Sequence, residues 1–370
     1  MTLTPSPPVP DVEAAALSAA EHAPRADRDG RLPDAVVEAL IGTGLLAHFV
    51  PRAFGGAAGR FADCLPALLR LAEADPSAGW CAAVMTSMSR MAACLPAAGQ
   101  EAVWAHGPHV PIAGTLQPAG TATPTAGGWL LSGRWPYCSG VHHARWALLS
   151  AVPEGAPGPR FLLVPRSAWT TEPTWSGAVG LRGTGSDTLV LDSEVFVPEG
   201  RSFTRERLFT ASDPRADGDC YRIPHEAVSG LFFALPLLGA ARAALSAWTA
   251  AASRHPSAGS LRDGDAALAT ASGKIDAADL LLRRAARTCD EPDALTPLLS
   301  ARCHRDHATA AGLLNEAVQT LFHSAGVSAT SGAGPLSRLW RDASVAALHP
   351  ALAVPPAARD YAARLLRRAE

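Results

Sequence analysis

The sequence predicts an α+β chain in three parts: an N-terminal helical domain, a central β-barrel or sandwich, and a C-terminal four-helix bundle. Two observations predict this order. Apolar residues recur at helical spacing near both ends of the chain, whereas short strand-like runs broken by Gly, Pro and Ser fill the middle. We place the three parts at residues 1–107, 108–205 and 206–370. With 370 residues, 48% of them hydrophobic, the chain is long enough for several buried cores.

The N-terminal part is predicted to be helical. Residues 32–51 form an amphipathic pattern with Gly and Pro stop signals, which predicts a helix followed by a loop at 51–56. Residues 61–96 predict two more helices. Asp75-Pro76-Ser77 separates them as a turn and a helix-start signal.

The central part is predicted to be a set of short strands. Four runs rich in Leu, aromatic and β-branched residues lie at 127–140, 145–152, 159–166 and 187–198. Turn residues separate them at short intervals, which favours a small barrel or sandwich.

The C-terminal part returns to long helical patterns, at residues 234–253, 267–287 and 301–326. Long helices joined by short polar loops favour a bundle. Residues 230–253 carry a single charge, Arg242, over a length that can span a membrane. Because a charge in mid-span is costly in lipid, we interpret this segment as a buried bundle helix and expect no membrane contact.

Composition excludes several classes of function. The net charge is −2 and no Lys/Arg stripe appears, so we expect no nucleic-acid partner. The N-terminus has neither a basic start nor an apolar core, so it does not predict a secretory signal. The seven cysteines are scattered without a CxxC pair, which favours reduced thiols and a cytoplasmic location.

No metal site is expected from the sequence. His304 and His307 share one face of a predicted helix, and their only candidate partners at suitable spacing are Cys303 and Asp306. We therefore expect a packed or solvated helix face at this position.

Several segments together resemble flavin-dependent monooxygenases built on the acyl-CoA dehydrogenase fold. The core signature is GTLQPAGTATPTAGGWLLSGRWPYCSGVHHARWALLSA at 114–151, and LRGTGSDTLVLDSEVFVPEG at 181–200 resembles the next flavin-side segment. PLSRLWRDASVAALH at 335–349 resembles the C-terminal Arg-Asp-to-His segment, and PRAFGG and DPSAGW resemble the N-terminal loop and helix start. The segments occur in the family's order over almost the whole chain.

The resemblance implies the oxygenase component of a two-component system. Such enzymes bind reduced flavin, FMN or FAD, delivered by a separate flavin reductase, and react it with molecular oxygen to a C4a-hydroperoxyflavin. Their substrates are aromatic or polyketide-type small molecules or amines. Similar proteins are homotetramers whose flavin sites borrow residues from a neighbouring subunit, and Arg254 and Arg262 lie in the loop placed to make that contact. The Arg- and Ala-rich composition suggests natural-product biosynthesis.

Ser139 lies at the family position whose hydroxyl accepts a hydrogen bond from flavin N5–H. That bond would discourage collapse to hydrogen peroxide. The alternative is that Ser139-Gly140 only makes a turn. Trp135 and Tyr137 precede the serine and are candidates to line the flavin ring, although aromatic residues on a strand are more often core.

Two further segments carry candidate site residues. Thr184, Gly185 and Ser186 form a polar loop before a strand and would bind flavin through hydroxyl and N–H groups, unless the loop is an ordinary turn. His349 occupies the position of the family's catalytic histidine, which would accept a substrate proton. Its alternative role is to cap a helix that Pro350 ends.

The sequence also departs from the family pattern. Where the family commonly has Asp-His, this chain has His142-His143. We expect neighbouring histidines on a strand to point to opposite faces, which disfavours a metal site.

Two other functions remain open. One is an oxidase or dehydrogenase acting on a thioester or carrier-bound substrate, but Pro350 occupies the slot of the dehydrogenase base. The other is a non-redox protein that retains the fold, for which the replacement at His142 leaves room.

Overall fold

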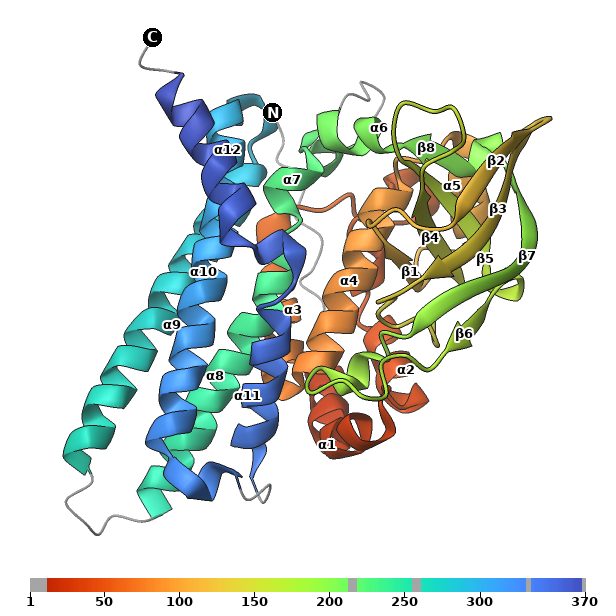
Figure 1. The fold of residues 1–370 in the computed structure, drawn as a ribbon. Coiled ribbons are helices and arrows are strands. Elements are labelled where there is room, and N and C mark those ends of the chain that lie inside the picture. The colour runs from red at the N-terminus through yellow and green to blue at the C-terminus, as the bar shows by residue number, and fades with distance from the viewer. Residues whose placement is uncertain (1–11, 212–217, 255–260, 331–333, 368–370) are drawn as a thin grey trace.

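A computed structural model describes residues 12–211, 218–254, 261–330 and 334–367. The chain begins with a layer of helices and ends with a helical bundle, and a β domain lies beside them (Figure 1). The N-terminal helices are α1 (Glu13–Asp29), α2 (Asp34–Gly42), α3 (Phe61–Ala74), α4 (Pro76–Ala92) and α5 (Ala97–Trp104).

The β domain contains two four-stranded sheets, with the orders β1-β4-β5-β8 and β2-β3-β7-β6. All pairs within them are antiparallel except β1 with β4. Apolar side chains from both sheets interdigitate in one core between them. The strands are β1 (Ile112–Thr115), β2 (Thr121–Thr125), β3 (Gly128–Trp135), β4 (Trp146–Ala151), β5 (Arg160–Pro165), β6 (Thr170–Glu172), β7 (Thr188–Pro198) and β8 (Ser202–Thr204).

The C-terminal helices pack around α8, which contacts α3, α4, α9, α10 and α11. The segment His225–Ser253, which includes most of α8, is long and apolar enough to cross a membrane, but 72% of its apolar window is buried by protein. The helices are α6 (Arg205–Thr210), α7 (His225–Val228), α8 (Leu231–Arg254), α9 (Leu261–Cys289), α10 (Pro297–Ser324), α11 (Pro335–Ala346) and α12 (Val354–Leu366).

Helix α4 joins the β domain to the bundle. Every residue from Pro76 to Ala92 is buried, as expected for a helix enclosed on all sides (Figure 1). The Asp75-Pro76-Ser77 start signal is confirmed: the Asp75 carboxylate accepts the backbone N–H of Ala78 at 3.1 Å. The other carboxylate oxygen of Asp75 accepts a hydrogen bond from the Arg338 guanidinium of α11 at 2.9 Å, so the capping residue also links α4 to the bundle.

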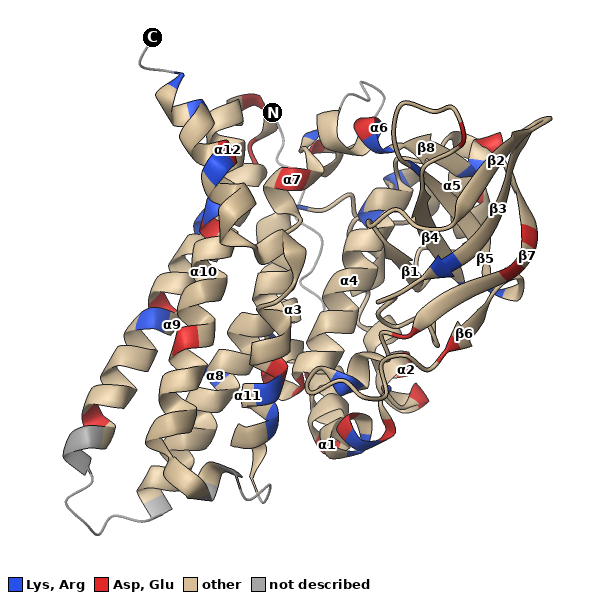
Figure 2. Cartoon of the chain, viewed as in Figure 1, with Lys and Arg blue, Asp and Glu red and all other residues tan. Residues whose placement is uncertain are grey.

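Charged residues of both signs are interspersed over the described helices and strands (Figure 2). The 32 basic and 34 acidic residues of the chain nearly cancel in total. None of the seven cysteines forms a disulfide, and all but Cys94 are buried.

Candidate active site

The candidate site lies where the β domain meets α4. The turn after β3 carries Ser139, and the loop before β7 carries Thr184 and Ser186. Two backbone hydrogen bonds join turn and loop: Cys138 N–H donates to Asp187 O at 3.2 Å, and Gly140 N–H donates to Thr184 O at 2.9 Å. This pairing holds the three hydroxyl groups together and buries them.

Glycine is favoured in this turn. Gly140 has φ 70°, a conformation that side chains disfavour, and an added Cβ would lie 2.5 Å from Met85 Cε on α4. Gly185 likewise has φ 52°, and an added Cβ there would lie 2.9 Å from the ring of His142.

The buried hydroxyls form a hydrogen-bonded chain with a fixed direction. Thr184 donates its only hydroxyl hydrogen to Leu181 O at 2.7 Å. Thr184 Oγ1 and Ser186 Oγ are 2.7 Å apart, so Ser186 must be the donor in that bond. Ser186 Oγ and Ser139 Oγ are 2.8 Å apart, and by the same reasoning Ser139 donates to Ser186.

The direction of this chain makes Ser139 an acceptor towards everything else. A hydroxyl has one hydrogen and two lone pairs, and the Ser139 hydrogen is used by Ser186. Trp80 Nε1–H donates to one lone pair of Ser139 Oγ at 3.0 Å. The second lone pair is left for an N–H group of a ligand.

Trp80 connects Ser139 to His349. Its indole lies edge-on to the His349 ring, with 5.6 Å between ring centroids, and also contacts Phe233 of α8 at 5.2 Å. The His349 ring stacks on Phe233 at 3.5 Å with an interplanar angle of 22°. The two candidate catalytic residues therefore contact the same buried indole.

His349 is a neutral hydrogen-bond donor in this structure. Burial lowers its pKa to about 4, so the ring is uncharged at neutral pH. Nδ1 accepts the backbone N–H of Ala351 at 3.2 Å, which leaves the ring proton on Nε2. The His349 side chain caps the start of the short 3₁₀ helix Pro350–Leu352, whereas the alternative expected from the sequence was a cap at the end of the preceding helix, and α11 has Ala347 as its C-cap.

The expectation that Trp135 lines the flavin is wrong. Its side chain is fully buried between the two sheets, and its Nε1–H donates to Ser150 O at 2.8 Å. A ligand would have to open the β-domain core to reach it. Tyr137 differs: its φ is 64°, the residue is 70% exposed, and its ring lies edge-on to Trp175 with 6.1 Å between ring centroids.

The interpretation of His142-His143 also needs correction. These residues lie in a turn rather than on a strand, and both line the same cavity of about 680 Å³. His142 Nε2 and Asp187 Oδ2 are 2.7 Å apart. The acid that the family has at position 142 is thus replaced by a histidine, and Asp187 places a carboxylate next to that histidine.

The arrangement fits a reduced flavin. A buried hydroxyl held as an acceptor suits the ring's N–H group, and the loop at 184–186 brings further hydroxyl and backbone groups to the same place. Trp80 was missed as a site residue by the sequence reasoning, which used DPSAGW only as a helix start. Phe233 was missed because nothing distinguishes it from core residues of α8.

Comparisons with known proteins identify the family of this chain. The acyl-CoA dehydrogenase N-terminal domain family matches residues 13–105, and its C-terminal domain family matches residues 231–353. The FADH(2)-dependent resorcinol hydroxylase oxygenase component of Rhizobium sp. (strain MTP-10005) is 33% identical, covering 86% of this chain and 84% of that protein. The oxygenase subunit HsaA of Mycobacterium tuberculosis is 30% identical, covering 87% of this chain and 85% of that protein.

Solved structures show the same fold. The 3-HSA hydroxylase from Rhodococcus sp. RHA1 superposes with a TM-score of 0.90 at 28% identity, covering 96% of both chains. XiaF from Streptomyces sp., solved with FADH2 and glycerol, gives a TM-score of 0.88 at 29% identity, covering 96% of this chain and 94% of that one. This chain therefore belongs to the flavin-dependent monooxygenases of the acyl-CoA dehydrogenase fold, as the oxygenase component of a two-component system.

Proposed function

We propose that this enzyme hydroxylates an aromatic small molecule that carries a phenolic hydroxyl group. The observation that carries the proposal is the placement of Trp80 between Ser139 and His349, which puts an acceptor for flavin and a donor for substrate around one aromatic side chain. Relatives named for resorcinol, indole-3-acetate and p-hydroxyphenylacetate support an aromatic substrate.

Reduced flavin, when bound, supplies the electrons that activate molecular oxygen so that one oxygen atom enters the substrate. Ser139 Oγ would accept a hydrogen bond from the N–H of flavin N5, which would hold that proton in place. Thr184 and Ser186 hold Ser139 in the accepting orientation. The buried position of all three hydroxyls keeps water away from them.

We further propose that His349 binds the substrate hydroxyl by donating from Nε2–H. This replaces the proton-accepting role that the sequence suggested, because the Nδ1 lone pair is already engaged by Ala351 N–H. A donor at the substrate oxygen stabilises its phenolate form and makes the ring more electron-rich. Phe233 and Trp80 provide the aromatic surfaces beside it.

A dehydrogenase function has less support. The slot of the dehydrogenase base holds Pro350, which is exposed and begins a 3₁₀ turn. Proline has no group that removes a substrate proton.

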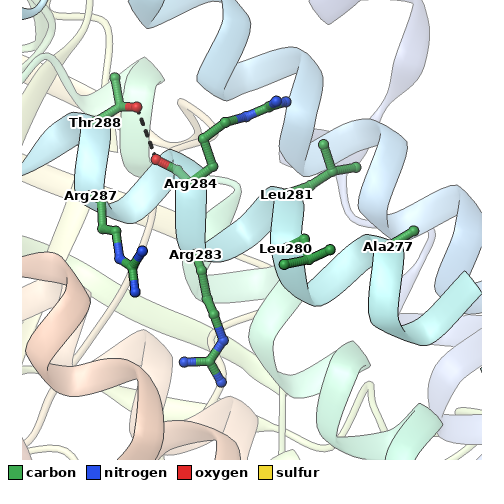
Figure 3. A pocket seen from close by; sticks show the side chains of 7 residues that line it. All are labelled: Ala277, Leu280, Leu281, Arg283, Arg284, Arg287 and Thr288. Atoms are coloured by element: carbon green, nitrogen blue, oxygen red, sulfur yellow. Dashed lines mark hydrogen bonds between the residues drawn. The ribbon is translucent and has the colours of Figure 1, made fainter.

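We propose that the chain forms a homotetramer. Helix α9 presents a hollow of about 820 Å³ lined by Ala277, Leu280, Leu281, Arg283, Arg284, Arg287 and Thr288 (Figure 3). Leu280 is 69% exposed there, which suits burial by a second copy of this chain. The side chains of Arg254 and Arg262, and residues 255–260 between them, lie outside the described residues. Light scattering with Leu280→Glu tests this proposal, with dissociation as the expected result.

We also propose a cytoplasmic location and a role in natural-product biosynthesis. The absence of a disulfide among the seven cysteines is consistent with a reducing compartment. The biosynthetic role rests on composition alone.

The function is tested by mixing the protein anaerobically with reduced FAD or FMN and then adding oxygen and a panel of phenols. We expect slower flavin reoxidation than in free solution and a product carrying one oxygen atom from ¹⁸O₂. Reoxidation at the free-solution rate with every phenol unchanged would contradict the proposal.

A further inference from the structure

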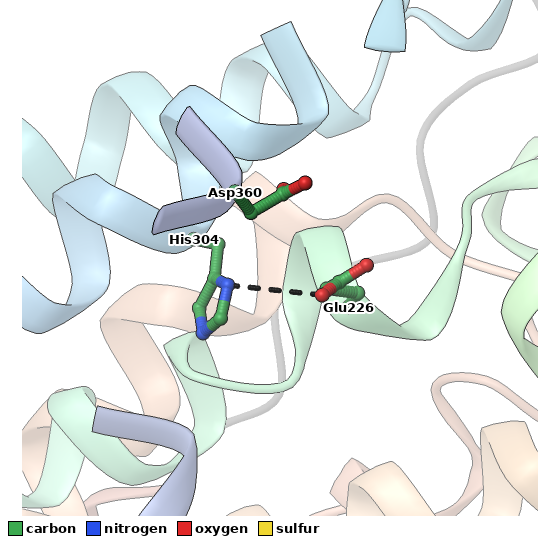
Figure 4. A group of neighbouring side chains, drawn as sticks. All are labelled: Glu226, His304 and Asp360. Atoms are coloured by element: carbon green, nitrogen blue, oxygen red, sulfur yellow. Dashed lines mark ion pairs between the residues drawn. The ribbon is translucent and has the colours of Figure 1, made fainter. Parts of the chain in front are cut away.

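Three potential metal ligands from three different helices converge at one place in the bundle. They are Glu226 on α7, His304 on α10 and Asp360 on α12. One ligand atom from each side chain lies within 4.8 Å of those from the other two. Figure 4 shows the His304 ring and the Glu226 carboxylate facing one another, with Asp360 beside them.

His304 gives independent support for a ligand at this place. Only 8% of the residue is exposed, and its Nδ1 atom is buried without a hydrogen-bond partner. Nδ1 lies 3.9 Å from Glu226 Oε1, which is too long for a hydrogen bond. Buried polar atoms are normally paired, so an unpaired nitrogen aimed at a carboxylate indicates a missing partner between the two.

The electrostatics favour a divalent cation as that partner. The carboxylates of Glu226 and Asp360 are the ligand groups that lie nearest to the His304 ring. The two carboxylates supply two negative charges to a divalent ion, one of which also pairs with Arg364. Arg364 donates to Asp360 Oδ1 at 2.8 Å and orients that carboxylate from outside, as partners of metal ligands commonly do.

We propose that Glu226, His304 and Asp360 bind one Zn²⁺ ion, with water in the fourth position. One imidazole and two carboxylates form a ligand set that zinc accepts, with bonds of about 2.0–2.2 Å. Ligand atoms on one tetrahedral ion lie about 3.4 Å apart, so the present spacing must close by up to roughly 1.4 Å. Glu226 and Asp360 are partly exposed and can supply most of this movement by changing rotamer.

The ion would fasten the last helix to the bundle. Asp360 is on α12, whereas the other two ligands are on α7 and α10. A zinc ion shared by all three would add a link across helices that come from distant parts of the sequence. The site is independent of the proposed reaction, because none of its three ligands is among the residues assigned to flavin or substrate.

The test uses tag-free protein, stripped with a chelator and titrated with Zn²⁺ alone by calorimetry. We expect one ion per chain, with Kd in the micromolar range or tighter. Glu226→Gln and His304→Gln should each weaken binding at least tenfold, and zinc should raise the melting temperature of the wild type more than that of either variant. With Co²⁺ in place of zinc, visible absorption bands should appear in the wild type and should be weakened in Glu226→Gln and His304→Gln.

Two variants keep this test decisive. Glu226 is partly exposed at its side chain, so Glu226→Gln is expected to fold normally, which circular dichroism checks. His323→Ala, at an exposed histidine on the same helix, should bind zinc as the wild type does. Less than one ion per chain, equal affinity in Glu226→Gln and the wild type, or loss of binding in His323→Ala would each overturn the proposal.

Discussion

The carboxylate of Asp342 accepts the backbone N–H of Leu181, with 2.6 Å between Oδ1 and the nitrogen. The carbonyl oxygen of Leu181 accepts hydrogen bonds from the Thr184 hydroxyl at 2.7 Å and from the Trp175 indole N–H at 3.0 Å. These bonds to its N–H and carbonyl groups hold Leu181 at φ 50°, a backbone conformation that is rare for leucine. The Arg341-Asp342 segment thereby positions the carbonyl on which the hydroxyl chain ends.

Asp342→Ala should destabilise the protein by about 1–3 kcal/mol, because it leaves a buried N–H group unpaired. Asp342→Asn keeps an acceptor oxygen and should cost much less. Unfolding in urea at pH 7 gives both values. Equal losses in the two variants would show that the hydrogen bond to Leu181 is not the source of the effect.

Asp342 should also make stability depend on pH. Burial, and after it the charge of Asp75, raises the pKa of Asp342 to about 7. The folded protein therefore holds a proton that the unfolded chain loses above about pH 4. The stabilising contribution of Asp342 is complete below that pH and is lost as the pH rises through 7. Relative to the wild type, Asp342→Asn should gain stability from pH 4 to 7 and then level off; parallel curves would contradict this.

Ser139→Ala should uncouple oxygen consumption from product formation. Losing one hydrogen bond of about 1–1.4 kcal/mol corresponds to roughly five- to tenfold more hydrogen peroxide per product. Peroxide and product are measured together in the presence of a flavin reductase. Ser193→Ala, at an exposed serine of β7, is the matched control and should couple as the wild type does. Unchanged coupling in Ser139→Ala would remove this residue from the mechanism.

Ser186→Ala should have the same effect as Ser139→Ala in weaker form. Without its acceptor, the Ser139 hydroxyl is free to rotate and to donate elsewhere, so it accepts the flavin N–H less often. Thr184→Val breaks the next bond in the chain and should uncouple less again, whereas Thr184→Ser should restore coupling. Wild-type coupling in both Ser186→Ala and Thr184→Val would show that Ser139 needs no orientation by its neighbours.

Substitutions of His349 distinguish a donor from a base. Gln retains an N–H donor but cannot take up a proton, so His349→Gln should keep a substantial part of kcat, whereas His349→Ala should lose about 10²-fold or more. Because the pKa of His349 is about 4, its titration should not alter the rate between pH 6 and 8. Equal losses in the two variants would favour proton acceptance instead. His323→Gln is the control at an exposed position.

Much of the architecture follows from local sequence patterns. The helix start at Asp75 and the strand that follows Ser186 are set by neighbouring residues, and both appear as expected. The position of Ser139 next to Thr184 follows only from the family resemblance, because the turn and the loop are joined by backbone bonds between distant segments.

Other features were beyond sequence reasoning for physical reasons. Trp135 and Tyr137 lie two positions apart on one run, but the positive φ of Tyr137 shows that the strand has already ended there, so alternation gives no guide to which ring is exposed. The partners of His304 come from α7 and α12, whereas helical spacing pointed only to residues on the same helix. Contacts between residues far apart in the sequence produce no local spacing pattern, so they cannot be predicted from such patterns.

Trp80 has a consequence for how mutational effects combine. Because its indole donates to Ser139 and contacts His349, the free energies of losing the two residues should not add. The double variant should lose less activity than the product of the two single losses predicts. Replacing Trp80 with Phe should remove most of that shortfall, because Phe keeps an aromatic ring and removes the donor. Ser139 and His349 would then contribute independently to activity, so that a substitution at one residue would no longer change the effect of a substitution at the other.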